Sequence, residues 1–275
     1  MKVKIHTLAE DYAGYESPFL AQHGISFLIE YRGKKVLFDA GQNAAPIFHN
    51  MELLKVSPGD IDYIFLSHCH YDHTGGLIEI LRKIGKRIPV IAHPAIFRKH
   101  FVMKPSLRHV RIPFRREDVE EYGDLLLTAE PFQIVEGMYS TGEIAEREEF
   151  ERKNPEVYTL RDGRIVRDDL RDDMSIAIRT PEGLVIVSGC SHAGIVSIVK
   201  HALRLTGEKR VRAVVGGFHL IDAGEERIKM TVEAFKELGV EEVYTGHCTG
   251  LRAEAAFLEA YGDRFHKLHA GMVIE

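Results

Sequence analysis

Ser67-His68-Cys69-His70-Tyr71-Asp72-His73-Thr74-Gly75-Gly76 places three imidazoles and a carboxylate within six residues. The apolar run before it, residues 61–66, predicts a short buried strand. Apolar residues at helical spacing in residues 77–84 predict a helix, with Asp72 or Thr74 as its N-cap. The segment is therefore expected to form a strand-to-helix loop at the carboxyl edge of a sheet.

The residue types in this loop are those of a metal site. Neutral imidazoles and carboxylates are the usual protein donors for zinc and other late first-row metals. His68 and His70, two apart on an extended loop, are expected to bind one ion, and Asp72 and His73 a second. The helix N-terminus favours the ionised form of Asp72. Three surface histidines in a polar loop are the alternative, but the density of ligand-type residues favours a metal site.

Three loops farther along the chain repeat this plan. Each follows an apolar strand and places a histidine among small residues: His192 after 184–187, His219 after 211–215, and His247 after 240–244. Sites in α/β sheets lie outside the carboxyl ends of the strands, and glycines beside the histidines let the backbone turn sharply. Together with His68, these loop histidines predict one shared site. His23 and His93 are lone histidines, for which a structural role is favoured.

The order His68-x-His70-x-Asp72-His73 before two glycines resembles the signature of the metallo-β-lactamase superfamily. The resemblance implies an α/β fold, a four-layer αββα sandwich of two mixed β-sheets flanked by helices. It implies one domain over residues 1–275, with residues 97–160 as a variable flap or insert. Flavin-linked di-iron relatives carry Glu where this chain has His70, which favours zinc-type hydrolytic chemistry over oxygen chemistry.

The resemblance also implies a ligand set. The expected ligands are His68, His70 and His192 for a first ion, and Asp72, His73 and His247 for a second. Asp39, at a strand end, matches a carboxylate that lies beneath the metal loop, with a turn aspartate as the alternative. The expected cofactors are two divalent metal ions, zinc first, with manganese or iron as alternatives.

Two departures from the family pattern leave this ligand set open. The residue after Ser188-Gly189 is normally a bridging Asp, and here it is Cys190, whose thiolate would bridge the ions or whose side chain would simply pack. Asp173 is the alternative bridging carboxylate, with a cap as its other interpretation. The usual upstream histidine loop is absent, because residues 139–143 read Tyr-Ser-Thr-Gly-Glu. Whether one or two ions bind therefore stays open.

A narrower resemblance points to the dihydropterin-6-methyl-(ribofuranosyl)aminobenzene 5′-phosphate synthase branch of the superfamily. It covers nearly the whole chain and is weakest over residues 97–160. Its segments are Phe38-Asp39-Ala40-Gly41-Gln42, Gly189-Cys190-Ser191-His192-Ala193-Gly194-Ile195, Gly217-Phe218-His219-Leu220 and His247-Cys248-Thr249-Gly250.

The leading functional hypothesis is a metal-dependent hydrolase. Two cations would share a water, lower its pKa from about 15.7 towards roughly 7, and direct the hydroxide at a small anionic or phosphorylated substrate. His219 would protonate the leaving group or bind substrate. The first alternative is the transferase of the narrower branch, which would release pyrophosphate as a carbon–carbon or carbon–nitrogen bond to the pterin forms. The second is a non-catalytic metal-binding protein.

Several residues are candidates for contact with the substrate. Residues 97–116 are basic, and Arg108 and Arg111 are expected to bind a phosphate or carboxylate from a mobile flap. A solvated surface loop is the alternative. Phe218 and Thr249 lie in the histidine loops and are further candidates. The available aromatic side chains for a pterin pocket are Tyr71, Phe101, Phe114 and Phe218.

Composition narrows the class of protein. The 275 residues carry a net charge of −5, which gives no reason to expect nucleic acid or a membrane as partner. The three cysteines are an odd set near ligand-type histidines, which favours a reducing cytoplasm over disulfides. The N-terminus lacks the apolar core of a signal peptide. Scarce Asn and Gln beside abundant Glu, Arg and Lys is typical of thermophiles. The sequence does not set the oligomeric state.

Overall fold

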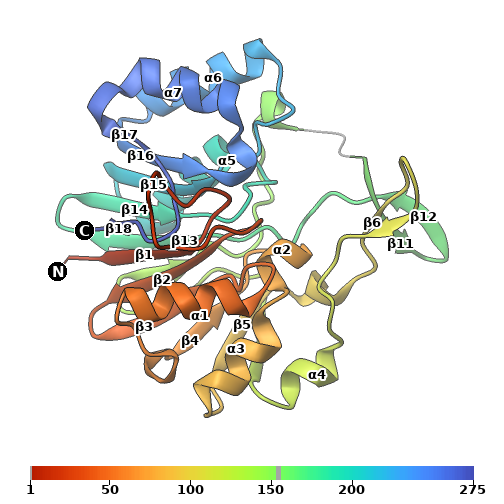
Figure 1. The fold of residues 1–275 in the computed structure, drawn as a ribbon. Coiled ribbons are helices and arrows are strands. Elements are labelled where there is room, and N and C mark those ends of the chain that lie inside the picture. The colour runs from red at the N-terminus through yellow and green to blue at the C-terminus, as the bar shows by residue number, and fades with distance from the viewer. Residues whose placement is uncertain (1, 153–155) are drawn as a thin grey trace.

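The structure is a computed structural model that describes residues 2–152 and 156–275. Two seven-stranded sheets pack face to face, and helices cover both outer faces (Figure 1). The N-terminal half of the chain forms most of one sheet with its helices, and the C-terminal half forms the other, except that the last strand, residues 273–274, joins the first sheet. This arrangement confirms the expected α/β sandwich of four layers.

Both sheets are mixed. The first has the order β18 (Val273–Ile274), β1 (Lys4–Ala9), β2 (Ser26–Tyr31), β3 (Lys34–Phe38), β4 (Tyr63–Phe65), β5 (Pro89–Ala92) and β8 (Asp124–Leu127). The second has the order β17 (Phe265–Lys267), β16 (Val240–Gly246), β15 (Val211–Gly217), β14 (Gly183–Val187), β13 (Ile176–Thr180), β10 (Met138–Ser140) and β9 (Phe132–Val135). Strands β3, β4, β5 and β8 run parallel, as do β14, β15, β16 and β17. Their carboxyl ends therefore meet at one edge of the sandwich.

Helices complete the outer layers. The first sheet is covered by α1 (Ala44–Leu53), α3 (Leu77–Ile84) and the short α4 (Arg116–Glu120), and the second by α5 (Ile195–Thr206), α6 (Glu225–Glu237) and α7 (Leu251–Tyr261). Short 3₁₀ turns span Pro58–Asp60, Pro94–Phe97, Glu149–Glu151, His247–Thr249 and Gly262–Arg264. No described helix combines the length and the apolar character needed to cross a bilayer.

Three apolar cores hold these layers together. On β2, Phe27 and Ile29 point between the two sheets, whereas Leu28 points towards α1 and α3. Side chains alternate in this way along a strand, so a strand that is buried on both faces reads as a continuous apolar run. The third core lies between the second sheet and its helices.

A small third sheet stands apart from the sandwich. It has the order β12 (Arg164–Arg167), β11 (Val157–Arg161), β6 (Phe101–Val102) and β7 (Arg108–His109). The hairpin of β11 and β12, which turns at Asp162-Gly163, pairs with the basic segment 97–116, because β11 pairs with β6. This sheet lies beside the edge where the parallel strands end (Figure 1).

The local structure after β4 differs from the prediction in one respect. Residues Tyr71–Thr74 form a helical turn of their own, α2, before α3 begins. The N-cap of α3 is Gly76, so neither Asp72 nor Thr74 caps that helix. Thr74 instead donates its hydroxyl to the carbonyl of His70, and Asp72 points into the site.

Candidate metal centre

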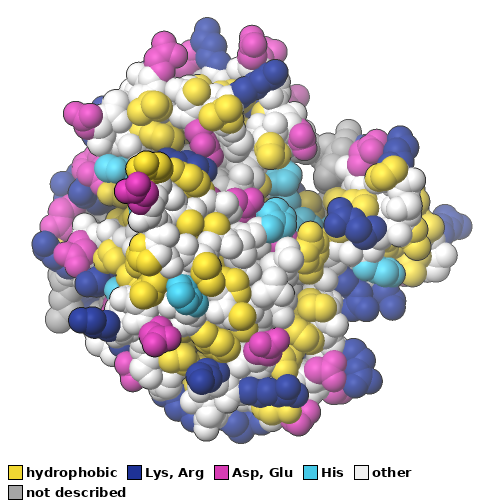
Figure 2. Space-filling view, in the orientation of Figure 1, with side chains coloured by type: hydrophobic (Ala, Val, Ile, Leu, Met, Phe, Trp, Pro, Cys, Tyr) yellow, Lys and Arg dark blue, Asp and Glu magenta, His cyan; other side chains and the backbone are white. Residues whose placement is uncertain are grey.

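The candidate site lies at the edge where the parallel strands end. Figure 2 shows histidines gathered in the hollow between the sandwich and the third sheet. Asp39, Ser191, His219 and His247 all have positive φ angles, from 45° to 60°, in the loops that build the site. Such left-handed backbone is costly for residues other than glycine, and its concentration here is typical of a functional site.

The first cluster consists of His68, His70 and His192, whose ligand atoms all lie within 4.8 Å of one another. His70 Nδ1 lies 3.2 Å from His192 Nε2. Burial lowers the pKa of each of these imidazoles, which favours the neutral form that binds a cation. His68 Nε2 is buried and has no hydrogen-bond partner among the described residues. A buried donor atom without a partner is costly, and a cation in the cluster would satisfy it.

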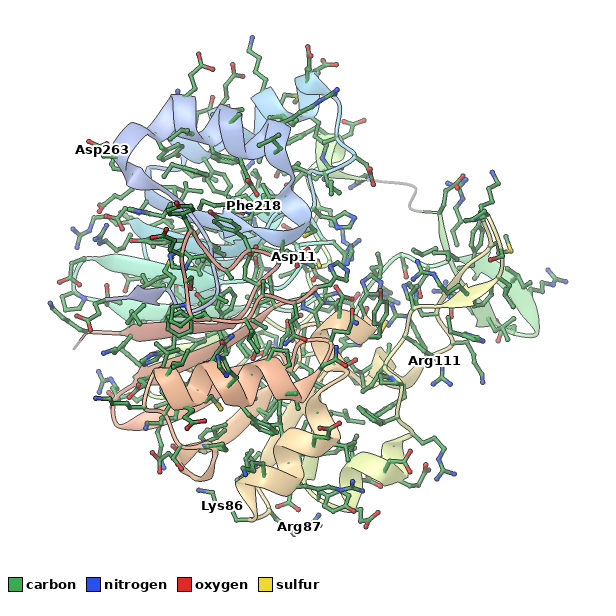
Figure 3. All side chains as sticks on the ribbon, viewed as in Figure 1. Asp11, Lys86, Arg87, Arg111, Phe218 and Asp263 are labelled. Carbon is green, nitrogen blue, oxygen red and sulfur yellow. The ribbon has the colours of Figure 1, made fainter. Side chains whose placement is uncertain are left out.

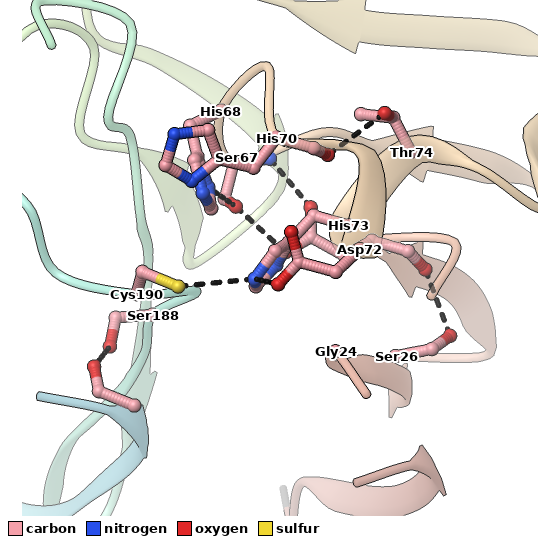
Figure 4. Close-up of polar contacts among 12 residues, drawn as sticks. Gly24, Ser26, Ser67, His68, His70, Asp72, His73, Thr74, Ser188 and Cys190 are labelled. Atoms are coloured by element: carbon pink, nitrogen blue, oxygen red, sulfur yellow. Dashed lines mark hydrogen bonds and ion pairs between the residues drawn. The ribbon is translucent and has the colours of Figure 1, made fainter. Parts of the chain in front are cut away.

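The second cluster consists of Asp72, His73, Cys190 and His247. Cys190 Sγ lies 3.1 Å from His73 Nε2 (Figure 4) and 3.4 Å from His247 Nε2. Asp72 Oδ2 lies 3.4 Å from the first of these nitrogens and 3.5 Å from the second. Four ligand-type atoms thus converge on one point, which is the arrangement that a cation requires.

Cys190 belongs to more than one group. Its sulfur also lies within 4.8 Å of ligand atoms of His192 and His219, so it stands between the two clusters. This is the place expected for a bridging ligand, and bridging remains a prediction. Burial raises the pKa of the Cys190 thiol, and a bound cation would favour the thiolate. Asp173, the alternative bridge, accepts a hydrogen bond from the Ala193 amide and belongs to no ligand group among the described residues.

A hydrogen-bond network fixes the tautomer of the two loop imidazoles beneath the clusters. Asp39 Oδ2 lies 2.7 Å from His73 Nδ1 and 2.7 Å from the Ser67 hydroxyl, which lies 2.8 Å from His68 Nδ1. The carboxylate accepts from His73 and from Ser67, and the Ser67 oxygen in turn accepts from His68. Both imidazoles therefore carry a proton on Nδ1, and Nε2 is the atom that each can offer to a cation. Gly189 is needed here, since a Cβ would lie 2.3 Å from the Ser67 hydroxyl.

The electrostatics of His73 follow from its neighbours. Burial would lower the pKa of His73, but the charges of Asp72 and Asp39 outweigh burial and raise it to about 9. The same contacts hold the pKa of Asp72 well below its usual range, against the effect of burial. The protein without metal therefore holds a proton on His73, and that proton must leave before Nε2 can bind a cation.

Sequence reasoning missed the carboxylates that follow β1. Asp11 Oδ1 lies 2.8 Å from His247 Nδ1, which leaves His247 Nε2 facing the second cluster. Glu10 accepts a hydrogen bond from the His247 amide. His23, for which a structural role was favoured, lies 3.5 Å from Asp72 and 3.1 Å from Asp11. The available signal was a pair of carboxylates directly after a strand, the pattern used to find Asp39.

A second network, also missed, supports His70. His70 Nε2 lies 2.8 Å from His100 Nε2, and His100 Nδ1 lies 2.7 Å from Asp168 Oδ2. Arg98 pairs with Asp168 and Asp172, and the Asp172 carboxylate accepts a hydrogen bond from the Cys69 amide. Because Asp168 accepts a hydrogen bond from His100 Nδ1, His100 Nε2 can accept one from His70 Nε2, which leaves His70 Nδ1 free to bind a cation.

Two predicted substrate contacts are wrong in the structure. The Phe218 side chain is fully buried between the second sheet and its helices, where it packs against Phe235 and Phe257 (Figure 3). Thr249 is fully buried as well, and its hydroxyl accepts a hydrogen bond from the Phe218 amide. Because both side chains are fully buried, neither is positioned to contact a substrate.

The remaining candidates from the sequence lie on different elements, and only some of them line the cavity above the clusters. Arg108 lies on the third sheet and lines the cavity above the clusters. Arg111 forms a backbone bridge with His70 at the foot of that sheet (Figure 3). Tyr71 lines the cavity, whereas Phe101 is buried against Tyr158. Phe114 packs against the helices of the first sheet. His93 is buried and caps a 3₁₀ turn, so its role is structural.

Three cavities meet at this site. The first, called the ligand cavity, has a volume of about 290 Å³ and is lined by His70, Asp72, Cys190 and His247 among others. The second, called the arginine cavity, measures about 490 Å³ and is lined by four arginines: Arg147, Arg152, Arg171 and Arg227. The third, called the outer cavity, measures about 700 Å³. His219 lines all three cavities.

This chain is similar to known proteins in both sequence and structure. The family model described as the metallo-beta-lactamase superfamily matches residues 23–142. A Methanocaldococcus jannaschii protein, 7,8-dihydropterin-6-methyl-4-(beta-D-ribofuranosyl)-aminobenzene-5′-phosphate synthase, is 48% identical over 99% of this chain and 96% of its own length. An uncharacterized protein of the same organism is 34% identical over 86% of this chain and 87% of its own. The crystal structure of Tm1679, a metal-dependent hydrolase of the beta-lactamase superfamily, superposes with a TM-score of 0.85 at 29% identity, covering 100% of this chain and 99% of that one.

Proposed function

The chain belongs to the metallo-β-lactamase superfamily of enzymes, and on that premise we propose that it is a metal-dependent synthase. The proposed reaction joins a 7,8-dihydropterin, through its 6-methylene carbon, to 4-(β-D-ribofuranosyl)aminobenzene 5′-phosphate. The observation that carries the proposal is the 48% identity to the Methanocaldococcus jannaschii synthase, because it spans 99% of the chain. This reading replaces hydrolysis, our leading hypothesis from the sequence, with its first alternative.

The cavities support a reaction between two substrates. The ligand cavity lies over the two clusters, and the arginine cavity opens beside it with His219 in the walls of both. One cavity can hold the dihydropterin with its leaving group while the other holds the aminobenzene partner. Tyr71 lines the ligand cavity and offers an aromatic face for the pterin ring.

The reaction balances as a substitution. The amino nitrogen attacks the methylene carbon, a carbon–nitrogen bond forms, and the carbon–oxygen bond to pyrophosphate breaks. The nitrogen then loses a proton, and nothing is oxidised or reduced. His219 is the residue proposed to take that proton, because its half-buried imidazole lies where the cavities meet and its ring centroid is 4.3 Å from that of His192.

The remaining residues prepare the site. His68, His70 and His192 would hold one divalent ion, and Asp72, His73, Cys190 and His247 a second, with zinc as the first choice and manganese or iron as alternatives. When bound, these ions would supply positive charge for the pyrophosphate that leaves. Asp39, Asp11 and Asp168 keep the imidazoles in the tautomer that can bind a cation.

The test is the dependence of pyrophosphate release on both substrates. A 7,8-dihydropterin that carries pyrophosphate on its 6-methylene carbon is incubated with the metal-loaded protein, with and without 4-(β-D-ribofuranosyl)aminobenzene 5′-phosphate. We expect pyrophosphate release only when both are present, together with the coupled product. Release of the same amount of pyrophosphate without the aminobenzene partner would instead identify a hydrolase, the activity named for Tm1679.

A variant of His219 separates its role from metal binding. His219→Ala is expected to keep the bound metal and to lower turnover by about 100-fold or more, the usual effect of losing a general base. Metal content is measured by mass spectrometry, and turnover by pyrophosphate release. His201→Ala is the control, because His201 bonds to the Thr141 carbonyl and lines none of the three cavities. Loss of metal from His219→Ala would contradict the proposed role.

A further inference from the structure

One guanidinium in the wall of the arginine cavity forms no ion pair with the described residues. Arg227, on α6, lines both the arginine cavity and the outer cavity. Its Nε is buried and has no hydrogen-bond partner among the described residues. A buried polar group without a partner is costly, so such a group in a cavity wall calls for a ligand.

Arg98, another half-buried arginine, shows what a structural pairing looks like. Arg98 is held by Asp168 at 2.6 Å and by Asp172 at 2.6 Å. Against the effect of burial, these carboxylates raise the pKa of Arg98. Burial lowers the pKa of Arg227. The charge of Glu151 opposes this effect but does not outweigh it.

Glu151 does not serve as the missing partner. Its carboxylate accepts hydrogen bonds from the Val196 amide at 2.9 Å, the Ser197 amide at 2.8 Å and the Ser197 hydroxyl at 2.6 Å. These bonds satisfy the first turn of α5 and hold the carboxylate there. The guanidinium of Arg227 therefore keeps its donors for something else.

The remaining charges of the cavity wall are already engaged or exposed. Arg147 donates to the carbonyls of Ile144, Asp169 and Leu170, and Arg171 pairs with Glu143 at 2.7 Å. Asp169 lies 3.6 Å from Arg161. Arg152 is exposed, and among the described residues its side chain donates through Nε to the Arg147 carbonyl. It lines both cavities beside Arg227. Two guanidiniums, Arg152 and Arg227, thus face the space where the cavities join.

We infer that Arg227, with Arg152 beside it, binds a phosphate group of the substrate where the arginine cavity meets the outer cavity. Guanidinium groups match the geometry of phosphate oxygens and form charge-assisted hydrogen bonds with them. Neither arginine lines the ligand cavity over the clusters. This position suits a phosphate remote from the reacting carbon, which is the 5′-phosphate of the aminobenzene partner, an assignment that rests on the proposed function. The pyrophosphate leaving group is the other source of the same chemistry.

The test measures binding without turnover. Ribose 5-phosphate, ribose and pyrophosphate are titrated calorimetrically into the metal-loaded wild type and into Arg227→Gln. We expect Arg227→Gln to weaken ribose 5-phosphate by about tenfold or more, while pyrophosphate binding is nearly unchanged and ribose binds weakly to both. Arg227→Lys should recover part of the loss, because the charge remains. Arg152→Gln, a change at an exposed residue, should weaken ribose 5-phosphate without affecting the fold.

The control variant is Lys229→Gln, which removes one positive charge from the same helix. Lys229 is exposed, lies 3.8 Å from Glu233 and lines neither the arginine cavity nor the outer cavity. It should bind ribose 5-phosphate like the wild type. Equal affinities of wild type and Arg227→Gln for both phosphate compounds would overturn the inference, and so would an equal loss in Lys229→Gln. A loss confined to pyrophosphate would overturn the assignment to the sugar phosphate. If phosphate binding depends on Arg227 but the protein has no synthase activity, the phosphate site is supported and only the proposed reaction is contradicted.

Discussion

At the scale of single residues, four imidazoles of the site are held through the nitrogen that faces away from the clusters. His73 and His247 meet a carboxylate directly, and His68 reaches Asp39 through the Ser67 hydroxyl. His70 is the exception, because a second histidine, His100, stands between it and its carboxylate. Such outer contacts orient a ligand and set its tautomer, which is why they affect metal affinity without touching the metal.

The first prediction tests this contact. His100→Ala is expected to weaken metal binding by about 10- to 100-fold, because His70 Nε2 loses the acceptor that fixes its tautomer. Affinity is measured by competition with a chromophoric chelator. His109→Ala is the control, since His109 lies on the third sheet, which begins directly after His100, but is exposed and contacts Phe101 edge to face. His100→Gln keeps an acceptor at this position and should recover part of the affinity; unchanged affinity in a folded His100→Ala protein would contradict the prediction.

The second prediction concerns Cys190, which lies where the family usually places an aspartate. If its sulfur bridges the clusters, the cobalt-substituted protein should show a thiolate-to-metal absorption band, and Cys190→Ala should lose the band and bind less metal. Cys190→Asp should lose the band but retain both ions, because the carboxylate can bridge instead. Cys69→Ala is the control, as Cys69 is fully buried and belongs to no ligand group among the described residues. A band that survives in Cys190→Ala would exclude this bridge.

At the scale of elements, the site depends on close approach between loops from distant parts of the sequence. The loop before β2 passes directly beneath α2, and a Cβ on Gly24 would lie 1.8 Å from the Asp72 carbonyl oxygen. Gly24 also has a φ of +110°, a conformation that other residues rarely adopt. The position of Asp72 therefore depends on a residue far from the metal loop in sequence.

The third prediction compares two glycines. Gly24→Ala should displace Asp72 and weaken metal binding at the second cluster, in addition to destabilising the fold. Gly33→Ala is the matched control, because Gly33 also has a positive φ, +73°, but its Cβ would meet nothing within 4 Å. This control should cost about 1 kcal/mol of stability and leave the metal content unchanged. Equal metal content in the two variants would show that the approach of Gly24 to Asp72 does not matter.

At the scale of the whole molecule, we expect the fold to form without the metals. Each apolar core is built from sheets and helices: one lies between the sheets, and one lies under each helical layer. The ligand residues stand on loops at the edge of these cores. Metal binding should then add to the stability of a protein that is already folded, unlike the small domains that unfold without zinc.

The fourth prediction follows from this separation. Removal of metal by a chelator should abolish activity and lower the melting temperature, while the far-UV circular dichroism spectrum and cooperative unfolding are retained. The stability lost depends on the excess of metal, and is about 2.7 kcal/mol when free metal is 100-fold above its dissociation constant. Scanning calorimetry with and without chelator measures it. A chelated protein without a cooperative transition would show that the ions hold the fold together.

The sequence by itself determined the fold and the approximate place of the site. Apolar runs such as Leu184–Val187 specify strands buried on both faces, and loops at the carboxyl ends of parallel strands must meet at one edge. That reasoning predicted that His68, His192 and His247 lie at one site, and the structure places them in the two neighbouring clusters. Strand patterns and strand-end loops are local in sequence, which is why they can be predicted.

The tertiary structure alone decided which side chains support the site and which belong to the core. Asp11 and His100 act through contacts 236 and 30 residues apart in sequence, and no local pattern encodes such a contact. Phe218 lies beside His219, yet its ring points into the core while the histidine lines the cavities. Neighbouring residues on one loop can face opposite ways, and only the packing of distant elements selects the direction. Among the described residues, the same packing gives Arg98 two paired carboxylates and leaves the Arg227 Nε without a hydrogen-bond partner.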